Sequence, residues 1–270
     1  HVTLVLNGDI FDFDLTTALP DDSPWPTSWL ERRCGLAPTA EKSPWKLTRI
    51  LEHHPVFVDS ILDFLERGGD IVYVLGNHDR EMHFENMQVT FEKALVDRAK
   101  ERNLEWRGGG ITYEPWFYYE EGVLFAEHGN QYDPFTSYRH ILSPVIRIAD
   151  EELLSLPMGN LSNRCMLSQM GQFNPFSGEY IKSGLGYAVH WVRHYLFSGR
   201  SLVLNWLFGA ILTFVRLMRI RSSEGAGPAV DDISLREFAN RKGLSPQQLE
   251  ELLELQTPPV SSKIFRVMHT

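Results

Sequence analysis

Residues 2–12, VTLVLNGDIFD, begin as an uninterrupted apolar run and end in polar side chains. The run is rich in β-branched and aliphatic residues and stops at Gly8, a pattern that predicts a buried β-strand. Asp9 and Asp12 follow directly, where this strand is expected to end. The question is whether other parts of the chain supply partners for these carboxylates.

A second run, DIVYVLGNHD at residues 70–79, repeats this arrangement. The intervening residues 55–67 predict a helix that two glycines end, with one apolar face formed by Phe57, Ile61, Leu62, Phe64 and Leu65. Strand, helical crossover and strand form a βαβ unit, which predicts a parallel sheet and an α/β fold. The second strand is followed by five consecutive polar residues, 77–81, that a fold has no packing reason to gather.

The neighbouring segments complete a coarse outline of the fold. Residues 14–48 are rich in Pro, Trp, Ser and Asp, and we expect them to be irregular. A further helix is expected over residues 87–102. Residues 111–133 predict two strands that turn near residues 121–122, and the second of these strands ends in His128.

Three predicted strands therefore end in polar clusters, at residues 8–9, 76–79 and 128–130. In open α/β sheets, ligands bind at the carboxyl ends of the strands. We expect the three clusters to converge on one site. The alternative interpretation is that these residues merely cap the ends of strands.

Length and composition indicate an ordinary folded domain, or one domain with a large insertion. The chain has 270 residues, of which 43% are hydrophobic and 23% charged. Its net charge of −9 argues against general nucleic-acid binding, so no nucleic-acid partner is expected. The composition does not indicate an oligomeric state.

Two cysteines are too few for a disulfide framework. With only Cys34 and Cys165, a reducing compartment is the simpler interpretation, and a bridge between the two is the alternative. The sequence opens at His1 in a strand-like run without a signal peptide, as in a piece excised from a longer protein. We expect a cytoplasmic location, with peripheral contact to the inner face of the membrane.

The composition divides the chain into three regions: 1–137, 138–222 and 229–270. The middle region ends in an apolar stretch, residues 181–222, that contains no Asp or Glu and six basic residues, Lys182, Arg193, Arg200, Arg216, Arg219 and Arg221. Residues 186–222 predict a buried lid or core helix, a helix that docks in the bilayer interface, or a membrane span. Arginines beside a bilayer favour anionic headgroups.

The last region, after a Gly/Ser/Pro linker at residues 222–228, predicts two short helices. Each has a capping signal, in which Ser234 is followed by Glu237, and Ser245 by Pro246 and Gln248. The pair superficially resembles a helix-turn-helix. Acidic residues are as frequent there as basic ones, so a small helical hairpin is expected instead of a DNA contact.

The polar clusters offer ligands of mixed chemistry. Asp9 supplies carboxylate oxygens, His128 an imidazole nitrogen and Asn77 an amide oxygen. This combination suits Mn²⁺, Fe or Zn²⁺ better than Ca²⁺ or Cu⁺. Two divalent ions that share a carboxylate would polarise a phosphoryl group and generate hydroxide near neutral pH. Gly8 and Gly76 would let the backbone approach the ions closely.

The motifs GDIFD (8–12), GNHD (76–79) and HGN (128–130) resemble the successive blocks of the calcineurin-like metallophosphoesterase superfamily. The runs around them are most similar to the branch that contains UDP-2,3-diacylglucosamine diphosphatase. The resemblance implies an α/β fold with an αββα sandwich core over residues 1–137. It also implies a largely helical insertion or lid, residues 138–222, which in that branch covers the acyl chains of a lipid substrate.

The resemblance also implies a role for each motif residue. Asp9 would bridge two divalent metal ions, most readily Mn²⁺, with Fe or Zn as alternatives. Asn77 and His128 would be further metal ligands. His78 would contact the phosphoryl group as an acid or charge stabiliser, and Asp79 would orient His78.

Three other residues near the motifs receive supporting roles. Asp12 would lie just outside the metals. Arg80 and Asn130 are candidates for substrate contact or for supporting the ligands, while a plain surface loop is the alternative for Arg80.

The family pattern contains two blocks that these 270 residues lack. An Asp-x-His block precedes the first motif in the family, and a Gly-His-x-His block lies near its C-terminus. We expect either that both blocks lie outside this sequence or that this piece is inactive.

The sequence thus leads to one main hypothesis and two alternatives. The main hypothesis is a dinuclear metal-dependent hydrolase of a phosphate ester or diphosphate, acting on a phosphorylated small molecule or lipid at the membrane surface. The first alternative is a soluble phosphodiesterase or nuclease of the same superfamily. The second is a non-catalytic member that binds membrane or a partner.

Overall fold

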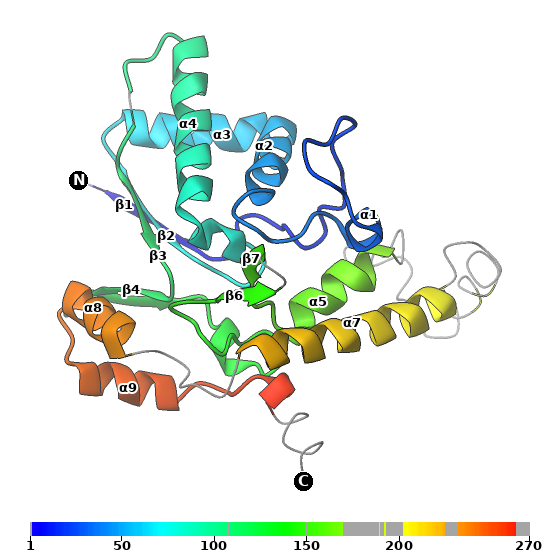
Figure 1. Ribbon diagram of the computed structural model, residues 1–270. Helices are drawn as coiled ribbons and strands as arrows, with labels where there is room; N and C mark the ends of the chain where they lie inside the picture. The colour runs from blue at the N-terminus through cyan, green and yellow to red at the C-terminus, as the bar shows by residue number, and fades with distance from the viewer. Residues whose placement is uncertain are drawn as a thin grey trace.

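The computed structural model describes residues 2–106, 108–148, 151–169, 189, 192, 202–224 and 232–262 (Figure 1). Within these residues the chain has a mixed α/β fold with three small sheets and no barrel. The predicted α/β class is confirmed. The αββα sandwich stays a prediction, because the described sheets have three, two and two strands.

A parallel three-stranded sheet contains the first two motif blocks at its carboxyl edge. Its strand order is β1-β2-β3, formed by β1 (Thr3–Asn7), β2 (Asp70–Val74) and β3 (Ile111–Glu114). The predicted βαβ unit is thus confirmed. Strand β2 is buried almost throughout, whereas β1 is only partly buried, contrary to expectation. The reason is that, among the residues that the structure describes, β1 is an edge strand and pairs with β2 alone.

Helices cover one face of this sheet (Figure 1): α2 (Ser43–His53), α3 (Pro55–Glu66) and α4 (Glu85–Glu101). The two helices predicted for this region, α3 and α4, are confirmed within two residues at their starts. Their apolar faces pack with β2 around Phe11, Leu62, Tyr73 and Phe91, all buried. A 3₁₀ turn, η1 (Arg80–His83), leads from the second motif block into α4.

The prediction that residues 14–48 are irregular is wrong in part. Helix α1 (Trp29–Cys34) begins with a capping box, in which Ser28 and Glu31 bond each other's backbone amides. Helix α2 also starts inside this segment, with a proline in its first turn. The Pro- and Trp-rich composition concealed both of these start signals.

The third motif block follows an antiparallel hairpin rather than a strand of the parallel sheet. The predicted first strand of residues 111–133 breaks at Pro115, so that β3 is separated from β4 (Phe117–Glu120). Strand β4 pairs with β5 (Leu124–Glu127) across the predicted turn at residues 121–122. A second 3₁₀ turn, η2 (Asn130–Tyr132), comes after His128.

Helices α8 (Asp232–Lys242) and α9 (Pro246–Glu254) form the predicted helical hairpin and pack against β4. Their common core contains Trp116, Phe117 and Phe238. Ser245 caps α9 as predicted, because its side chain accepts from the Gln248 amide. The same prediction for Ser234 is wrong, since the helix already includes Asp232.

The elements with described bounds in the middle region are a β-hairpin and the helical segments that follow it. They are β6 (Val145–Ile148), β7 (Glu151–Leu154), α5 (Met158–Cys165), η3 (Leu167–Gln169) and α7 (Leu202–Glu224). The expectation of a largely helical region missed the β6–β7 hairpin. Helix α7 packs closely on α5, since a Cβ on Gly209 would lie 2.8 Å from the Cys165 carbonyl oxygen.

Several expectations for the middle region concern residues that are not described, among them Lys182, Arg193, Arg200 and most of the linker at 222–228. The linker starts later than predicted, because α7 continues to Glu224. In the described segments, every helix is too short or too polar to cross a membrane.

Candidate metal centre

Asp9 lies where the three motif blocks meet. Its Oδ1 accepts a hydrogen bond of 2.9 Å from the backbone N–H of His78. Its Oδ2 lies 3.3 Å from Nε2 of His128, whose Nδ1 is 3.0 Å from the carbonyl oxygen of Asn7. The predicted convergence is confirmed, although β5 belongs to a different sheet from β1 and β2.

Two glycines make this approach possible. A Cβ on Gly8 would lie 2.4 Å from Nδ1 of His128, and a Cβ on Gly76 would lie 2.3 Å from Oδ1 of Asp9. Both positions therefore exclude any side chain. Asp9 itself has a positive φ of 53°, a conformation that residues other than glycine seldom adopt. The glycines make room for the side chains of the site, in addition to any bound ion.

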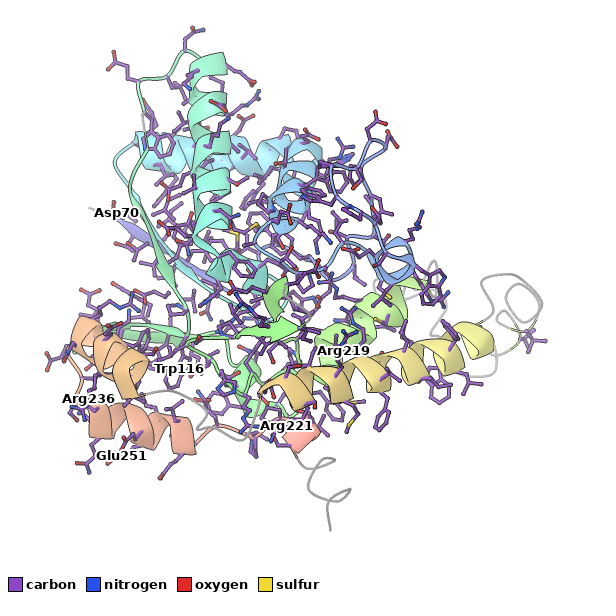
Figure 2. All side chains as sticks on the ribbon, viewed as in Figure 1. Asp70, Trp116, Arg219, Arg221, Arg236 and Glu251 are labelled. Carbon is purple, nitrogen blue, oxygen red and sulfur yellow. The ribbon has the colours of Figure 1, made fainter. Side chains whose placement is uncertain are left out.

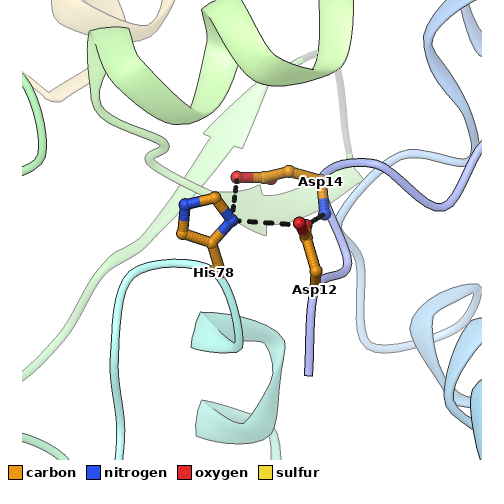
Figure 3. A group of neighbouring side chains, drawn as sticks. All are labelled: Asp12, Asp14 and His78. Atoms are coloured by element: carbon orange, nitrogen blue, oxygen red, sulfur yellow. Dashed lines mark hydrogen bonds and ion pairs between the residues drawn. The ribbon is translucent and has the colours of Figure 1, made fainter. Parts of the chain in front are cut away.

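A second group of ligands lies beside this pair (Figure 3). Nδ1 of His78 is 3.2 Å from Asp12 Oδ1 and 3.7 Å from Asp14 Oδ2. One ligand atom from each of the three residues lies within 4.8 Å of the others. Asp12, Asp14 and His78 could therefore hold a metal ion. Asp14 was not among the predicted site residues, although it follows Asp12 by two residues and is the third carboxylate of the same stretch.

The charges of this group depend on one another. The hydrogen bond to Asp12, with Asp14 nearby, raises the pKa of His78 to about 9, against the opposing effect of burial. Burial alone would raise the pKa of Asp12, but the hydrogen bond with His78, the charge of His78 and the backbone amides of Leu15 and Asp14 together lower it, and the net shift is downward. Burial raises the pKa of Asp14, which is 1% exposed. At neutral pH, His78 is thus an imidazolium held by Asp12.

Asp9 and His128 also form a pair of a carboxylate and an imidazole, in which the pKa of Asp9 is lowered and the pKa of His128 is raised. Burial opposes the ionisation of Asp9, yet the hydrogen bonds from His128 and from the His78 amide lower its pKa. The hydrogen bond to Asp9 raises the pKa of His128. An ion that binds either histidine must displace a proton, so metal binding would strengthen as the pH rises.

The residues fit a divalent ion. Oδ1 of Asp14 is buried and has no hydrogen-bond partner, so this carboxylate has an unused acceptor. Two carboxylates and one imidazole form an oxygen- and nitrogen-rich set of the kind that Mn²⁺, Fe and Zn²⁺ accept.

Helix α5 covers this group, which the sequence did not indicate. Nδ2 of Asn160 lies 2.5 Å from Asp14 Oδ2 and 2.8 Å from the carbonyl oxygen of Asn77. Nδ2 of Asn163 lies 3.4 Å from Nε2 of His78. These asparagines follow the GNHD block by more than eighty residues, and no motif links them to it.

Beneath Asp14 lies a network of buried charges. Glu81 Oε1 is 3.2 Å from Lys46 Nζ and 3.3 Å from Arg164 Nη1. Arg164 Nη1 is also 3.9 Å from Asp14 Oδ1. All four side chains are at most 1% exposed, so each charge depends on its partners for compensation.

Asp79 does not have the predicted role of orienting His78. Its carboxylate is fully buried and accepts from the backbone amides of Ile10, at 2.8 Å, and Gly76, at 2.7 Å. It also accepts from the Tyr73 hydroxyl at 2.6 Å. Asp79 thus fastens the first two motif loops together, and Asp12 is the carboxylate that orients His78.

Arg80 is also wrong as a candidate for substrate contact. It is fully buried, with Nη1 donating to the carbonyl oxygen of Pro115 at 2.6 Å and Nη2 to that of Ile141. Its guanidinium lies 4.9 Å from the centre of the Tyr138 ring. Arg80 therefore joins the second motif loop to the segment after β3 and to residues near 140.

Asn77 and Asn130 hold loops in place. The side chain of Asn77 is buried and donates to Asn160 Oδ1 at 3.4 Å. The Asn130 amide donates to Gln131 Oε1 and to the carbonyl oxygen of Thr136, both at 3.2 Å. The metal-ligand role of Asn77 stays a prediction, and the contacts of Asn130 are those of a loop residue.

Comparison of the chain with models of known protein families, with curated proteins and with solved structures gave no match. The resemblance to the metallophosphoesterases therefore stays a prediction, which rests on the three motif blocks and on their meeting at Asp9.

Proposed function

We propose that this chain is a metal-dependent hydrolase of phosphoester or diphosphate bonds. The observation that supports this most is the position of Asp9, whose carboxylate contacts His78 of the second block and His128 of the third. The contact with the second block is made by the backbone N–H of His78 and that with the third block by the imidazole of His128. A chance arrangement of polar strand ends would not bring three distant segments to one carboxylate.

In this proposal Asp9 and His128 hold divalent ions, with Mn²⁺ as the first choice. When bound, such ions polarise a phosphoryl oxygen and lower the pKa of water. Oδ2 of Asp9 and Nε2 of His128 face each other at 3.3 Å and supply one oxygen and one nitrogen ligand. The amide of Asn77 is a further candidate ligand if it leaves Asn160.

His78 acts as the proton donor to the leaving oxygen. Asp12 holds its Nδ1 at 3.2 Å, and this leaves Nε2 to face Asn163 on α5, 3.4 Å away. Binding a metal through Nδ1 would exclude this role, because the ion would replace the contact with Asp12. We assign the acid role because Asp12 holds Nδ1 of His78, so that the N–H at Nε2 is the one that can be donated.

The test is hydrolysis of bis(p-nitrophenyl) phosphate with Mn²⁺. Activity is expected to disappear with a chelator, and to fall by about a hundredfold or more in Asp9→Asn and His78→Ala. Asn suits the positive φ at position 9, so Asp9→Asn removes the charge without strain. His53→Ala, an exposed histidine in α2, is the matched control and should keep full activity.

Calorimetric titration with Mn²⁺ separates the two roles of histidine. Asp9→Asn should lose Mn²⁺ affinity, whereas His78→Ala should keep it while losing activity. Loss of Mn²⁺ binding in His78→Ala would make His78 a ligand and refute the acid role. Full activity in Asp9→Asn would refute the hydrolase, and a folded wild-type chain that binds Mn²⁺ without hydrolysis would favour the non-catalytic alternative.

A further inference from the structure

Helix α7 exposes an apolar row where a helix on the surface of a protein normally carries polar residues. The exposed side chains are between 44% and 56% accessible: Leu207, Phe208, Ile211, Phe214 and Val215. The opposite face, with Gly209, Leu217 and Ile220, is buried against α5 and the β6–β7 hairpin. Figure 2 shows α7 lying along the outside of the described structure, and the exposed fractions of the row show that no described element covers it.

Helix α1 extends this row into a surface. Trp29 is 59% exposed, and its ring meets that of Phe208 edge to face at 5.9 Å. The guanidinium of Arg33 lies 4.7 Å from the centre of the Phe208 ring. Together, the α7 row and Trp29 form what we call the α1–α7 surface. Aromatic side chains of this kind are enriched where proteins meet the interfacial zone of a bilayer.

The charge around the α1–α7 surface is positive. Arg219 is exposed and follows Val215 by one helical turn, and Arg32 is exposed on α1. The acidic residues of the two helices, Glu31 and Glu224, have side chains that are 8% and 6% exposed and are paired with Lys42 and Arg221. Neither presents a free negative charge. In a chain of net charge −9, this is a local positive region.

We propose that the α1–α7 surface docks on an anionic lipid bilayer, with its apolar side chains inserted at the boundary of headgroups and acyl chains. This goes beyond the proposed hydrolase activity and does not depend on it. An amphipathic helix with arginine at its border binds such a surface through apolar burial and attraction to anionic lipid. The absence of a spanning helix among the described residues is consistent with peripheral docking.

Charge argues against a second copy of the chain as the occupant. A two-fold contact through this surface would pair two patches of the same positive charge, without acidic partners on α1 or α7. An anionic bilayer offers the opposite charge and an apolar layer at once. We therefore commit to lipid and treat self-association as an outcome of the test.

The experiment is co-sedimentation of the full chain with vesicles of phosphatidylcholine alone or with about 30% phosphatidylserine. We expect binding to the anionic vesicles that weakens with salt. The double variant Ile211→Glu/Phe214→Glu should bind at least about tenfold more weakly, since it places charge where apolar side chains insert. Val56→Glu, at a 76% exposed position on α3, is the matched control and should bind like wild type.

Folding and self-association are checked on the same proteins. Circular dichroism and light scattering should show folded chains of unchanged mass in all variants, and Arg219→Glu should weaken binding to anionic vesicles without unfolding the chain. Failure of the wild-type chain to bind phosphatidylserine vesicles would overturn the proposal. Equal binding to both vesicle types would refute the role of charge, and a dimer that Ile211→Glu dissociates would assign the surface to a second copy.

Discussion

At the scale of single residues, the motif blocks predicted which residues lie in the candidate metal centre better than they predicted the role of each residue. Asp9, His78 and His128 meet as expected, because each directly follows the end of a strand. Asp79 and Asp12 exchange the roles that the motif implied, since Asp79 is fully buried among backbone amides. Which carboxylate turns toward His78 depends on loop conformation, and motif spacing does not specify that.

His83 leads to a pH prediction that is independent of the metal centre. Burial, with help from the charge of Arg80, lowers the pKa of His83 to about 4. In the unfolded chain this histidine has its ordinary pKa of about 6.5. As the pH falls from about 6.5 to about 4, only the unfolded chain takes up the proton, so His83 lowers the free energy of unfolding by up to about 3 kcal/mol.

Urea unfolding across this pH range measures the effect. His83→Gln should lose less stability than wild type as the pH falls, while His53→Gln, on the exposed side of α2, should follow wild type. Parallel curves for His83→Gln and wild type would show that His83 titrates in the folded chain as it does in the unfolded one.

At the scale of elements, starts of helices were predictable where a side chain cap and a proline coincide. Ser245 with Pro246 begins α9 as predicted, whereas Ser234 lies inside α8. A Ser and a Glu three residues apart are common within helices, so the spacing alone does not identify a helix start. The break between β3 and β4 was missed because both strands have aromatic, β-rich sequences.

Ser245→Ala is expected to lower the free energy of unfolding by about 1 kcal/mol, because the Gln248 amide loses its acceptor. Chemical denaturation followed by circular dichroism measures this loss. Ser60→Ala, at an exposed serine inside α3, should change stability by less than about 0.5 kcal/mol. Equal effects of the two substitutions would contradict a specific capping role for Ser245.

At the scale of the whole molecule, buried charges connect segments that are far apart in the sequence. Arg164 on α5 pairs with Glu81 after β2, and its Nη2 donates to the carbonyl oxygen of Leu36 after α1. The middle region, residues 138–222, is thereby attached to the first region through polar contacts, in addition to the apolar contacts within its own core.

Arg164→Met should therefore destabilise the chain by about 3–5 kcal/mol, because Glu81 and Asp14 would keep buried charges with one fewer partner. Arg147→Met is the control, since it breaks an exposed pair with Glu152 and should cost at most about 1 kcal/mol. Denaturant unfolding of both variants tests the difference. Similar costs for the two would mean that the buried network contributes no more than a surface pair.

Local patterns were sufficient for the βαβ unit, for α3, α4 and α9, and for the meeting of the first two motif blocks. Each of these depends on neighbours within one element, or on the rule that parallel strands end at one edge of a sheet. His128 reaches Asp9 from a separate antiparallel hairpin, a position that this rule does not specify. Only the tertiary structure revealed that β1 is an edge strand, that Asp14 joins His78, and that α5 covers the centre. These features depend on contacts between residues 60 to 150 positions apart, whose energies come from burial and charge pairing rather than from local sequence.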